Sequence, residues 1–143
     1  MTCSLCTNHA KSEIWRNKNF YLIDAEDPAF PCFLRVVACR HVPEMSLLTP
    51  EERMELWNIH NVVEEEIIKS LHPHKVNLAQ FGNMVPHLHW HIIARWSDDS
   101  HFPECPWGPV QREVPDAVQT ERRHMMEELK PSLRNILEKR FGH

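Results

Sequence analysis

Three histidines alternate with apolar residues in segment 87–92, which reads His-Leu-His-Trp-His-Ile. Successive side chains of a β-strand point to opposite faces, so we expect the imidazoles of His87, His89 and His91 on one face. A neutral imidazole is a nucleophile and general base near neutral pH, and it is also a frequent ligand of zinc. The spacing therefore predicts a catalytic or metal-binding strand. A half-buried structural strand in a chain with 11 histidines is the simpler alternative.

A Cys-x-x-Cys pair stands at Cys3 and Cys6. This spacing lets both sulfurs bind one metal ion from a tight turn. A redox pair or two free thiols are the alternatives, and the spacing alone leaves them open. The chain has five cysteines, an odd number, so in a reducing compartment we expect thiols or metal ligands rather than disulfides. The other three are Cys32, Cys39 and Cys105.

The composition limits the class of protein. A chain of 143 residues with 42% hydrophobic residues fits a single domain spanning residues 1–143. The net charge of −4 argues against long nucleic acids as partners, and three glycines argue against a glycine-rich phosphate loop. No window approaches the roughly 18 apolar residues of a membrane span, and the first nine residues contain no apolar signal core. We therefore expect a cytoplasmic protein that does not enter a membrane.

Several segments rich in β-branched and aromatic residues predict strands. Residues 14–15 and 20–23 form one strand or a pair, and further strands are expected at 33–39, 76–81 and 87–96. The connection at 82–86 is too short for a helical crossover, so the last two strands should be antiparallel neighbours. Arg35 interrupts an apolar strand, and it either binds an anion or pairs with Glu26 or Asp27.

Two segments are predicted to be helical. Thr49, Pro50 and Glu52 form an N-cap, a first-turn proline and a capping-box glutamate, so a helix should span 50–71. Residues 97–115 read as a loop that covers something, and 116–141 as a helix that Pro131 either kinks or divides. The expected buried residues of the first helix are Leu56, Ile59, Val63, Ile67 and Leu71. The expected surface histidines are His60, His72 and His74.

Segment 87–93 resembles the signature of the histidine triad family of nucleotide hydrolases and transferases, His-φ-His-φ-His-φ-φ with φ apolar. The resemblance covers about residues 1–100, and residues 101–143 correspond to a variable tail. It implies an α+β fold, in which an antiparallel sheet of about five strands packs with one long helix and, here, a C-terminal helix. It also implies a homodimer in which the sheet continues across the interface between the two copies.

The resemblance implies a covalent mechanism in two steps. His89 would attack the α-phosphorus of a dinucleoside polyphosphate or nucleoside phosphoramidate, and water would then release the nucleoside monophosphate. His91 is similar to the residue that contacts the phosphate and assists the leaving group. Arg35 and Arg95 are further candidates to meet the phosphoryl charge. The base, the leaving group and the physiological substrate are not fixed by the resemblance.

Further substrate contacts follow from the same resemblance. Asp24 looks like the ligand of the ribose hydroxyls, and Asn77, Gln80 and Asn83 stand where relatives carry amide side chains that hold phosphate or leaving group. Segment 82–86 reads Gly-Asn-Met-Val-Pro, so it lacks the hydroxyl that many relatives place before the triad.

A metal-binding branch of the family implies a structural zinc site at Cys3, Cys6, His41 and His87, with no catalytic cofactor. Cys39 and Cys105 are rival ligands. Two other functions stay open: a nucleotide-binding regulator with little turnover, and a metalloprotein that uses the three histidines themselves as ligands.

Overall fold

Five antiparallel strands form one sheet in the order β1-β2-β3-β5-β4. The computed structural model describes residues 3–7 and 11–143. The strands are β1 (Glu13–Arg16), β2 (Phe20–Asp24), β3 (Phe33–Ala38), β4 (Lys75–Ala79) and β5 (His89–Arg95). The predicted antiparallel neighbours β4 and β5 are confirmed, and residues 14–15 and 20–23 belong to a pair of strands.

The triad strand begins later than predicted. We expected it from residue 87, but β5 begins at His89. The His87 amide donates to the carbonyl oxygen of Val85 at 2.8 Å, so the chain is still turning at this point. The ladder with β3 starts only where His89 pairs with Val37.

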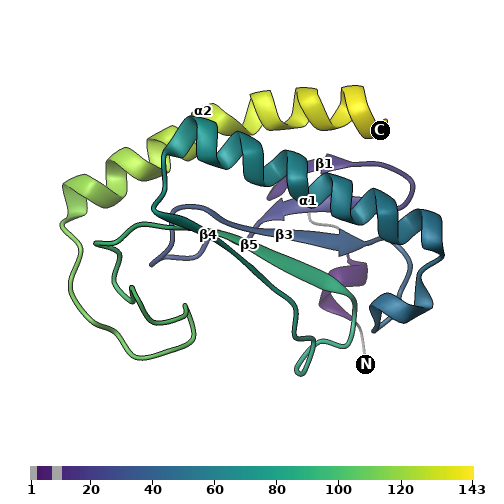
Figure 1. Ribbon diagram of the computed structural model, residues 1–143, viewed down its shortest axis with the longest axis horizontal. Coiled ribbons are helices and arrows are strands. Elements are labelled where there is room, and N and C mark those ends of the chain that lie inside the picture. Colours follow the sequence, from purple (N-terminus) through teal and green to yellow (C-terminus); the bar gives the residue numbers. More distant parts are fainter. Residues whose placement is uncertain (1–2, 8–10) are drawn as a thin grey trace.

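Helices α1 (Pro50–Leu71) and α2 (Asp116–Phe141) cover the same face of the sheet (Figure 1). The predicted capping box of α1 is present: the Glu52 amide donates to Thr49 Oγ1 at 3.1 Å, and the Thr49 amide donates to Glu52 Oε1 at 2.8 Å. Helix α2 continues through Pro131, which does not begin a second helix. The buried leucines on either side of Pro131, at 129, 133 and 137, hold it against its neighbours.

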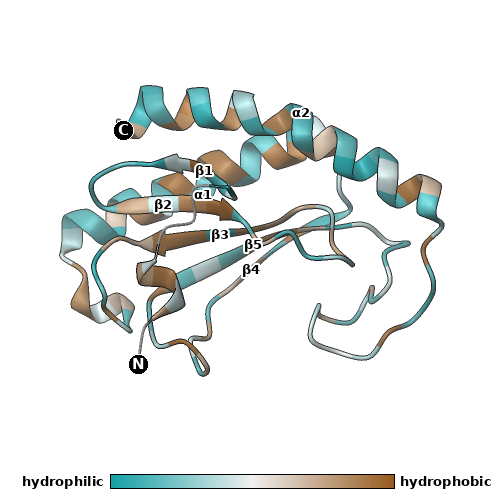
Figure 2. Cartoon of the chain, turned by 180° about the vertical axis from the view of Figure 1, so that it is seen from behind, coloured by the Kyte–Doolittle hydropathy of each residue, from teal (hydrophilic) through white to brown (hydrophobic). Residues whose placement is uncertain are grey.

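The main core lies between the two helices and the sheet. Figure 2 shows hydrophobic strands β2 and β3 beneath helices whose surfaces alternate between hydrophobic and hydrophilic residues. The predicted inner face of α1 is confirmed, since all five residues are at most 2% exposed: Leu56, Ile59, Val63, Ile67 and Leu71. Apolar periodicity therefore identified the face that packs on the sheet.

His60 is a correction to the predicted surface. It is 1% exposed, and its ring lies 5.1 Å from the ring centroids of both Trp57 and Trp90. Trp90 is the helix-facing side chain of the triad strand, so the imidazole is enclosed between α1 and β5. Burial lowers the pKa of His60 to about 4, which keeps the ring neutral. His72 and His74 are exposed, as predicted.

The opposite face of the sheet carries no helix longer than one turn in the described part of the chain. A short 3-10 helix at Ser4–Cys6 lies on the side away from α1 and α2 (Figure 1). Leu5 from this turn packs with Tyr21, Ile23 and Val37, which project from that face. None of the described helices is both long and apolar enough to cross a membrane.

Candidate active site and metal centre

His89 and His91 lie side by side on the face of β5 away from the helices. Their ring centroids are 5.1 Å apart, and they are 8% and 6% exposed. In the sheet, His89 is opposite Val37 on β3, and His91 is opposite Arg35 on β3 and Ala79 on β4. The alternation predicted from sequence therefore places two imidazoles together above the centre of the sheet.

The Nδ1 atom of His89 lies 2.6 Å from the backbone carbonyl oxygen of His87. A carbonyl can only accept, so Nδ1 carries the hydrogen and Nε2 keeps its lone pair. Burial lowers the pKa of His89, and the charge of Arg35 acts in the same direction. The imidazole is therefore neutral near pH 7, with one nitrogen oriented and the other available as a nucleophile.

His91 is buried beside aromatic rings. Its ring centroid lies 5.4 Å from that of Phe33 and 5.1 Å from that of Trp107. Burial, then the neighbouring His89 and Arg35, lower the pKa of His91 to about 4. Within the described residues, its buried Nδ1 has no hydrogen-bond partner. A neutral ring with a free buried nitrogen is suited to binding a polar group of a ligand.

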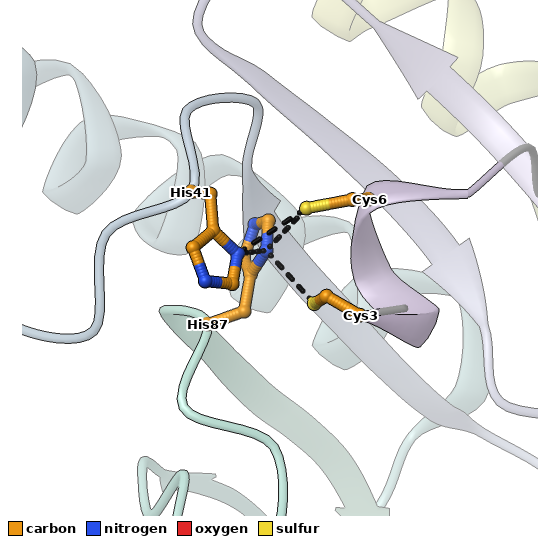
Figure 3. A group of neighbouring side chains, drawn as sticks. All are labelled: Cys3, Cys6, His41 and His87. Atoms are coloured by element: carbon orange, nitrogen blue, oxygen red, sulfur yellow. Dashed lines mark hydrogen bonds between the residues drawn. The ribbon is translucent and has the colours of Figure 1, made fainter. Parts of the chain in front are cut away.

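His87 joins a different group of side chains. Its Nδ1 atom lies 3.4 Å from Cys3 Sγ, 3.4 Å from Cys6 Sγ and 3.1 Å from His41 Nδ1. Cys6 Sγ also lies 3.2 Å from His41 Nδ1. Figure 3 shows the four side chains converging from the N-terminal turn, the segment after β3 and the segment before β5. The four ligand atoms all lie within 4.8 Å of one another.

The donor set fits a metal ion. His87 Nε2 lies 2.6 Å from the carbonyl oxygen of Ala38, so this nitrogen carries the hydrogen and Nδ1 presents its lone pair to the cysteines. Two thiolates and two imidazoles match a closed tetrahedral site. The Cys6 amide donates to the Cys3 carbonyl at 3.1 Å, which holds both sulfurs on one turn. These four residues could therefore hold one metal ion.

The rival cysteines lie outside this group. Cys39 Sγ is 3.5 Å from Arg16 Nη1 and 3.6 Å from the carbonyl oxygen of Asn17. Cys105 lies in the 97–115 loop and lines the cavity described next. In the described residues, only Cys3, Cys6, His41 and His87 form a group of three or more candidate ligands.

A cavity of about 540 Å³ opens above His89 and His91. Its walls are mostly apolar, and they come from the N-terminal turn, β3, the connection before β5 and the 97–115 loop. Among the described residues that line it there is no aspartate or glutamate, and Arg35 is the single lysine or arginine. The lining residues are Ser4, Leu5, Arg35, Phe81, Gly82, Asn83, Met84, Val85, His89, His91, Cys105 and Trp107.

Of the four residues expected to bind substrate, Asn83 lines this cavity and the other three do not. Asp24 is 7% exposed, and its Oδ2 lies 2.9 Å from Lys130 Nζ of α2. Asn77 Oδ1 accepts from Arg95 Nη1 at 2.9 Å. Gln80 Nε2 donates to the Phe81 carbonyl oxygen at 3.4 Å.

Arg95 is already paired inside the protein. It is 2% exposed, and its Nε lies 2.7 Å from Asp99 Oδ2, while Nη2 donates to the Glu104 carbonyl at 2.8 Å. Its side chain fixes the start of the 97–115 loop rather than meeting a phosphoryl group. Trp107 and Phe81 line the cavity but were not predicted as site residues. The one available signal was the position of Trp107 inside a loop that was expected to cover another part of the protein.

Comparison with known proteins identifies the family. Residues 7–98, more than half of the chain, match the family model described as the HIT domain. The chain belongs to the HIT domain family. Its relatives include the AP-4-A phosphorylase of Mycobacterium tuberculosis, 31% identical over 93 residues, which are 61% of this chain and 48% of the relative. This HIT protein therefore spans about half the length of the curated relatives it matches.

Solved structures agree on the HIT fold. A histidine triad protein from Bradyrhizobium japonicum superposes with a TM-score of 0.67 at 25% identity, covering 86% of this chain and 97% of that one. A histidine triad protein from Marinobacter aquaeolei VT8 gives a TM-score of 0.66 at 24% identity, covering 85% and 89%. The α+β fold, with a five-stranded antiparallel sheet and two helices, is thus confirmed.

Proposed function

We propose that this HIT protein is a nucleotide hydrolase or nucleotidyl transferase acting on a dinucleoside polyphosphate or a nucleoside phosphoramidate. The observation that carries the proposal is the hydrogen bond from His89 Nδ1 to the His87 carbonyl, which leaves the lone pair of Nε2 free on a side chain that lines the cavity. The name of the mycobacterial relative, AP-4-A phosphorylase, supports a dinucleoside polyphosphate as substrate.

In the first step, His89 Nε2 attacks the α-phosphorus. A nitrogen–phosphorus bond forms, and the bond from phosphorus to the bridging oxygen or amide nitrogen breaks. The leaving group takes that electron pair, and an amine leaving group also takes a proton from solvent. His89 keeps its Nδ1 hydrogen throughout, because the His87 carbonyl holds it. The ring of His91 lies beside that of His89 and lines the same cavity, so it can bind a phosphoryl oxygen or a leaving-group hydrogen.

In the second step, an acceptor attacks the nucleotidyl-histidine. Water gives the nucleoside monophosphate and returns the imidazole to its neutral form, with the water proton passing to solvent. Inorganic phosphate as acceptor would give a nucleoside diphosphate, the outcome that the word phosphorylase in the relative's name describes. Splitting one displacement into two lets the same nucleophile serve either acceptor.

The metal group plays a structural part in this proposal. Cys3, Cys6, His41 and His87 would hold a zinc ion with four protein ligands, so the ion would supply folding energy rather than Lewis acidity. Through these ligands the N-terminal turn would be fixed beside the triad strand. The alternative of a metal held by all three triad histidines would need His87 to leave the cysteines, which its hydrogen bond to the Ala38 carbonyl disfavours.

We also propose a homodimer and a cytoplasmic location, as the family resemblance suggests. Strand β4 is an edge of the sheet, and its Leu78 is 37% exposed. An edge strand with an exposed leucine suits pairing with a second copy. The mass of the protein in solution, measured by light scattering, tests the dimer.

The first experiment measures product release. Diadenosine polyphosphates and adenosine phosphoramidate are incubated with wild type and His89→Ala, each with and without inorganic phosphate. Release of AMP or ADP by wild type alone supports the proposal. If nucleotide bound but no substrate gave product, the alternative of a nucleotide-binding regulator with little turnover would be favoured instead.

A further inference from the structure

Arg35 is a half-buried cation that has no anionic partner among the described residues, although its guanidinium lies 5.9 Å from the centroid of the Phe33 ring. It lies on β3 directly opposite His91, and it lines the cavity. Among the described residues it forms no ion pair, and its buried Nε has no hydrogen-bond partner. Burying an arginine without a counter-ion costs free energy, and natural proteins normally pair such groups. The position therefore suits an anion that the described residues do not provide.

The nearest acidic group is already engaged. Asp27 is the one carboxylate whose charge acts on Arg35. However, Asp27 Oδ1 accepts the backbone amides of Ala29 at 2.8 Å and Phe30 at 3.2 Å, which caps that turn. The pairing of Arg35 with Glu26 or Asp27, one of the two sequence interpretations, is therefore absent: neither carboxylate forms an ion pair with it within 4.0 Å.

The sheet sets the distance between Arg35 and the nucleophile. His91 is the direct cross-strand neighbour of Arg35, whereas His89 is opposite Val37, two residues further along β3. Diagonal neighbours of this kind lie about 7 to 8 Å apart at the backbone, within reach of a long side chain. Arg35 therefore lines the same cavity as His89 and His91, within reach of a group bound next to the nucleophile.

We propose that Arg35 binds a second phosphoryl group of the substrate, adjacent to the one that His89 attacks, and so selects polyphosphates over phosphoramidates. The inference rests on the proposed function and decides between its two substrate classes. Adjacent phosphoryl groups share one bridging oxygen, so a polyphosphate chain that starts at His89 passes directly to the neighbouring position. A planar guanidinium binds phosphate oxygens in a bidentate manner.

Two features of the cavity support a leaving group that departs as an anion. Its described lining contains no carboxylate, so the field at Arg35 favours negative charge. Segment 83–86 carries no hydroxyl that could protonate an amine as it leaves. A phosphate leaving group needs no such proton when a cation receives the charge that develops on it.

The test compares wild type with Arg35→Gln, Arg35→Lys and the control Arg140→Gln. Arg140 is exposed near the end of α2 and does not line the cavity. We expect Arg35→Gln to lower kcat/KM for diadenosine tetraphosphate by about 10- to 100-fold, the value of a charge-assisted contact, and to leave adenosine phosphoramidate within about threefold. Arg35→Lys should show a smaller fall in kcat/KM for diadenosine tetraphosphate than Arg35→Gln. Arg140→Gln should match wild type.

A binding measurement separates this inference from the proposed function. Inorganic pyrophosphate, titrated calorimetrically, should bind wild type and Arg140→Gln and bind Arg35→Gln at least about tenfold more weakly. An equal fall in kcat/KM for both substrates, or unchanged pyrophosphate binding in Arg35→Gln, would overturn the role of Arg35. If wild type turned over neither substrate, the proposed function would fail, and the pyrophosphate comparison would still decide whether Arg35 binds phosphate. If Arg35→Gln did not fold, kcat/KM for the two substrates and pyrophosphate binding would be compared in Arg35→Lys and Arg35→Met instead.

Discussion

The carbonyl oxygen of His87 lies 2.6 Å from Nδ1 of His89, while the ring of His87 lies within the Cys3, Cys6 and His41 group. One residue therefore links the candidate metal centre to the proposed nucleophile: its side chain lies with the cysteines, and its backbone carbonyl orients the ring of His89. A metal ion that fixes His87 also fixes the carbonyl that selects the tautomer of His89.

Removing one metal ligand should affect both stability and rate. We expect Cys3→Ser to bind less than one zinc per chain, to lower the Tm by roughly 5 to 10 °C and to reduce turnover by about tenfold. Zinc content, thermal melting and AMP release are measured on the same samples. Cys39→Ser is the matched control and should keep its zinc. Full zinc in Cys3→Ser, with loss in Cys39→Ser, would move the site to the rival cysteine.

His60 should make the fold sensitive to acid. Its pKa is lowered to about 4 from 6.5 by burial, so the unfolded chain binds the proton more readily than the folded protein. The stabilisation is fully present above about pH 6.5 and is lost as the pH falls toward 4, a loss of roughly 3 kcal/mol. Because His91 shifts in the same direction, wild type keeps some acid dependence even without His60.

The measurement is urea unfolding at pH 7 and pH 4.5 for wild type, His60→Phe and the exposed control His124→Phe. His60→Phe should show a smaller difference between the two pH values, and His124→Phe should behave as wild type. An identical pH dependence in all three proteins would show that His60 is not enclosed by Trp57 and Trp90 in solution.

The variable tail should be part of the same folding unit. Leu133 on α2 is fully buried against the core, although the tail lies outside the family match at residues 7–98. We expect Leu133→Ala to lower the free energy of unfolding by about 2 to 5 kcal/mol, the cost of a core cavity. The adjacent exposed change Ser132→Ala should have little effect. A Leu133→Ala protein as stable as wild type would show that 116–141 is not needed by the domain.

Asp24 has two competing roles that a pair of variants separates. The structure pairs its Oδ2 with Lys130 Nζ at 2.9 Å, whereas the family resemblance implies a ribose contact. If the ion pair is its role, Asp24→Asn and Lys130→Met should each reduce stability by on the order of 1 kcal/mol and leave AMP affinity unchanged. A tenfold weaker AMP affinity in Asp24→Asn alone would restore the ribose contact.

Local patterns predicted the elements well because each depends on nearby residues. The Thr49 cap with Pro50 and Glu52 marks the start of α1, and the period of its apolar residues identifies its inner face. The alternation around His89 and His91 gives their common face and places the half-buried Trp90 on the other face. The Cys-x-x-Cys spacing and the family resemblance brought Cys3, Cys6, His41 and His87 together in advance of the structure.

Contacts between residues far apart in the sequence could not be predicted from any short window. Every residue of β2 is buried, so its sequence does not show which face Asp24 occupies. His60 is enclosed by Trp90 from a strand thirty positions away, and a helical pattern alone reads it as polar surface. Arg95 pairs with Asp99 because the chain turns back after the strand. A strand pattern that ends at Arg95 does not indicate this turn.

The most direct test of the central claim is the covalent intermediate itself. Wild type is mixed with diadenosine tetraphosphate, denatured within milliseconds at alkaline pH, and examined by intact mass and by peptide fragmentation. We expect an added adenylyl group on His89 that is absent in His89→Ala, while His89→Ala keeps the wild-type Tm and zinc content. An adenylyl group on another residue, or AMP release by His89→Ala at the wild-type rate, would contradict it.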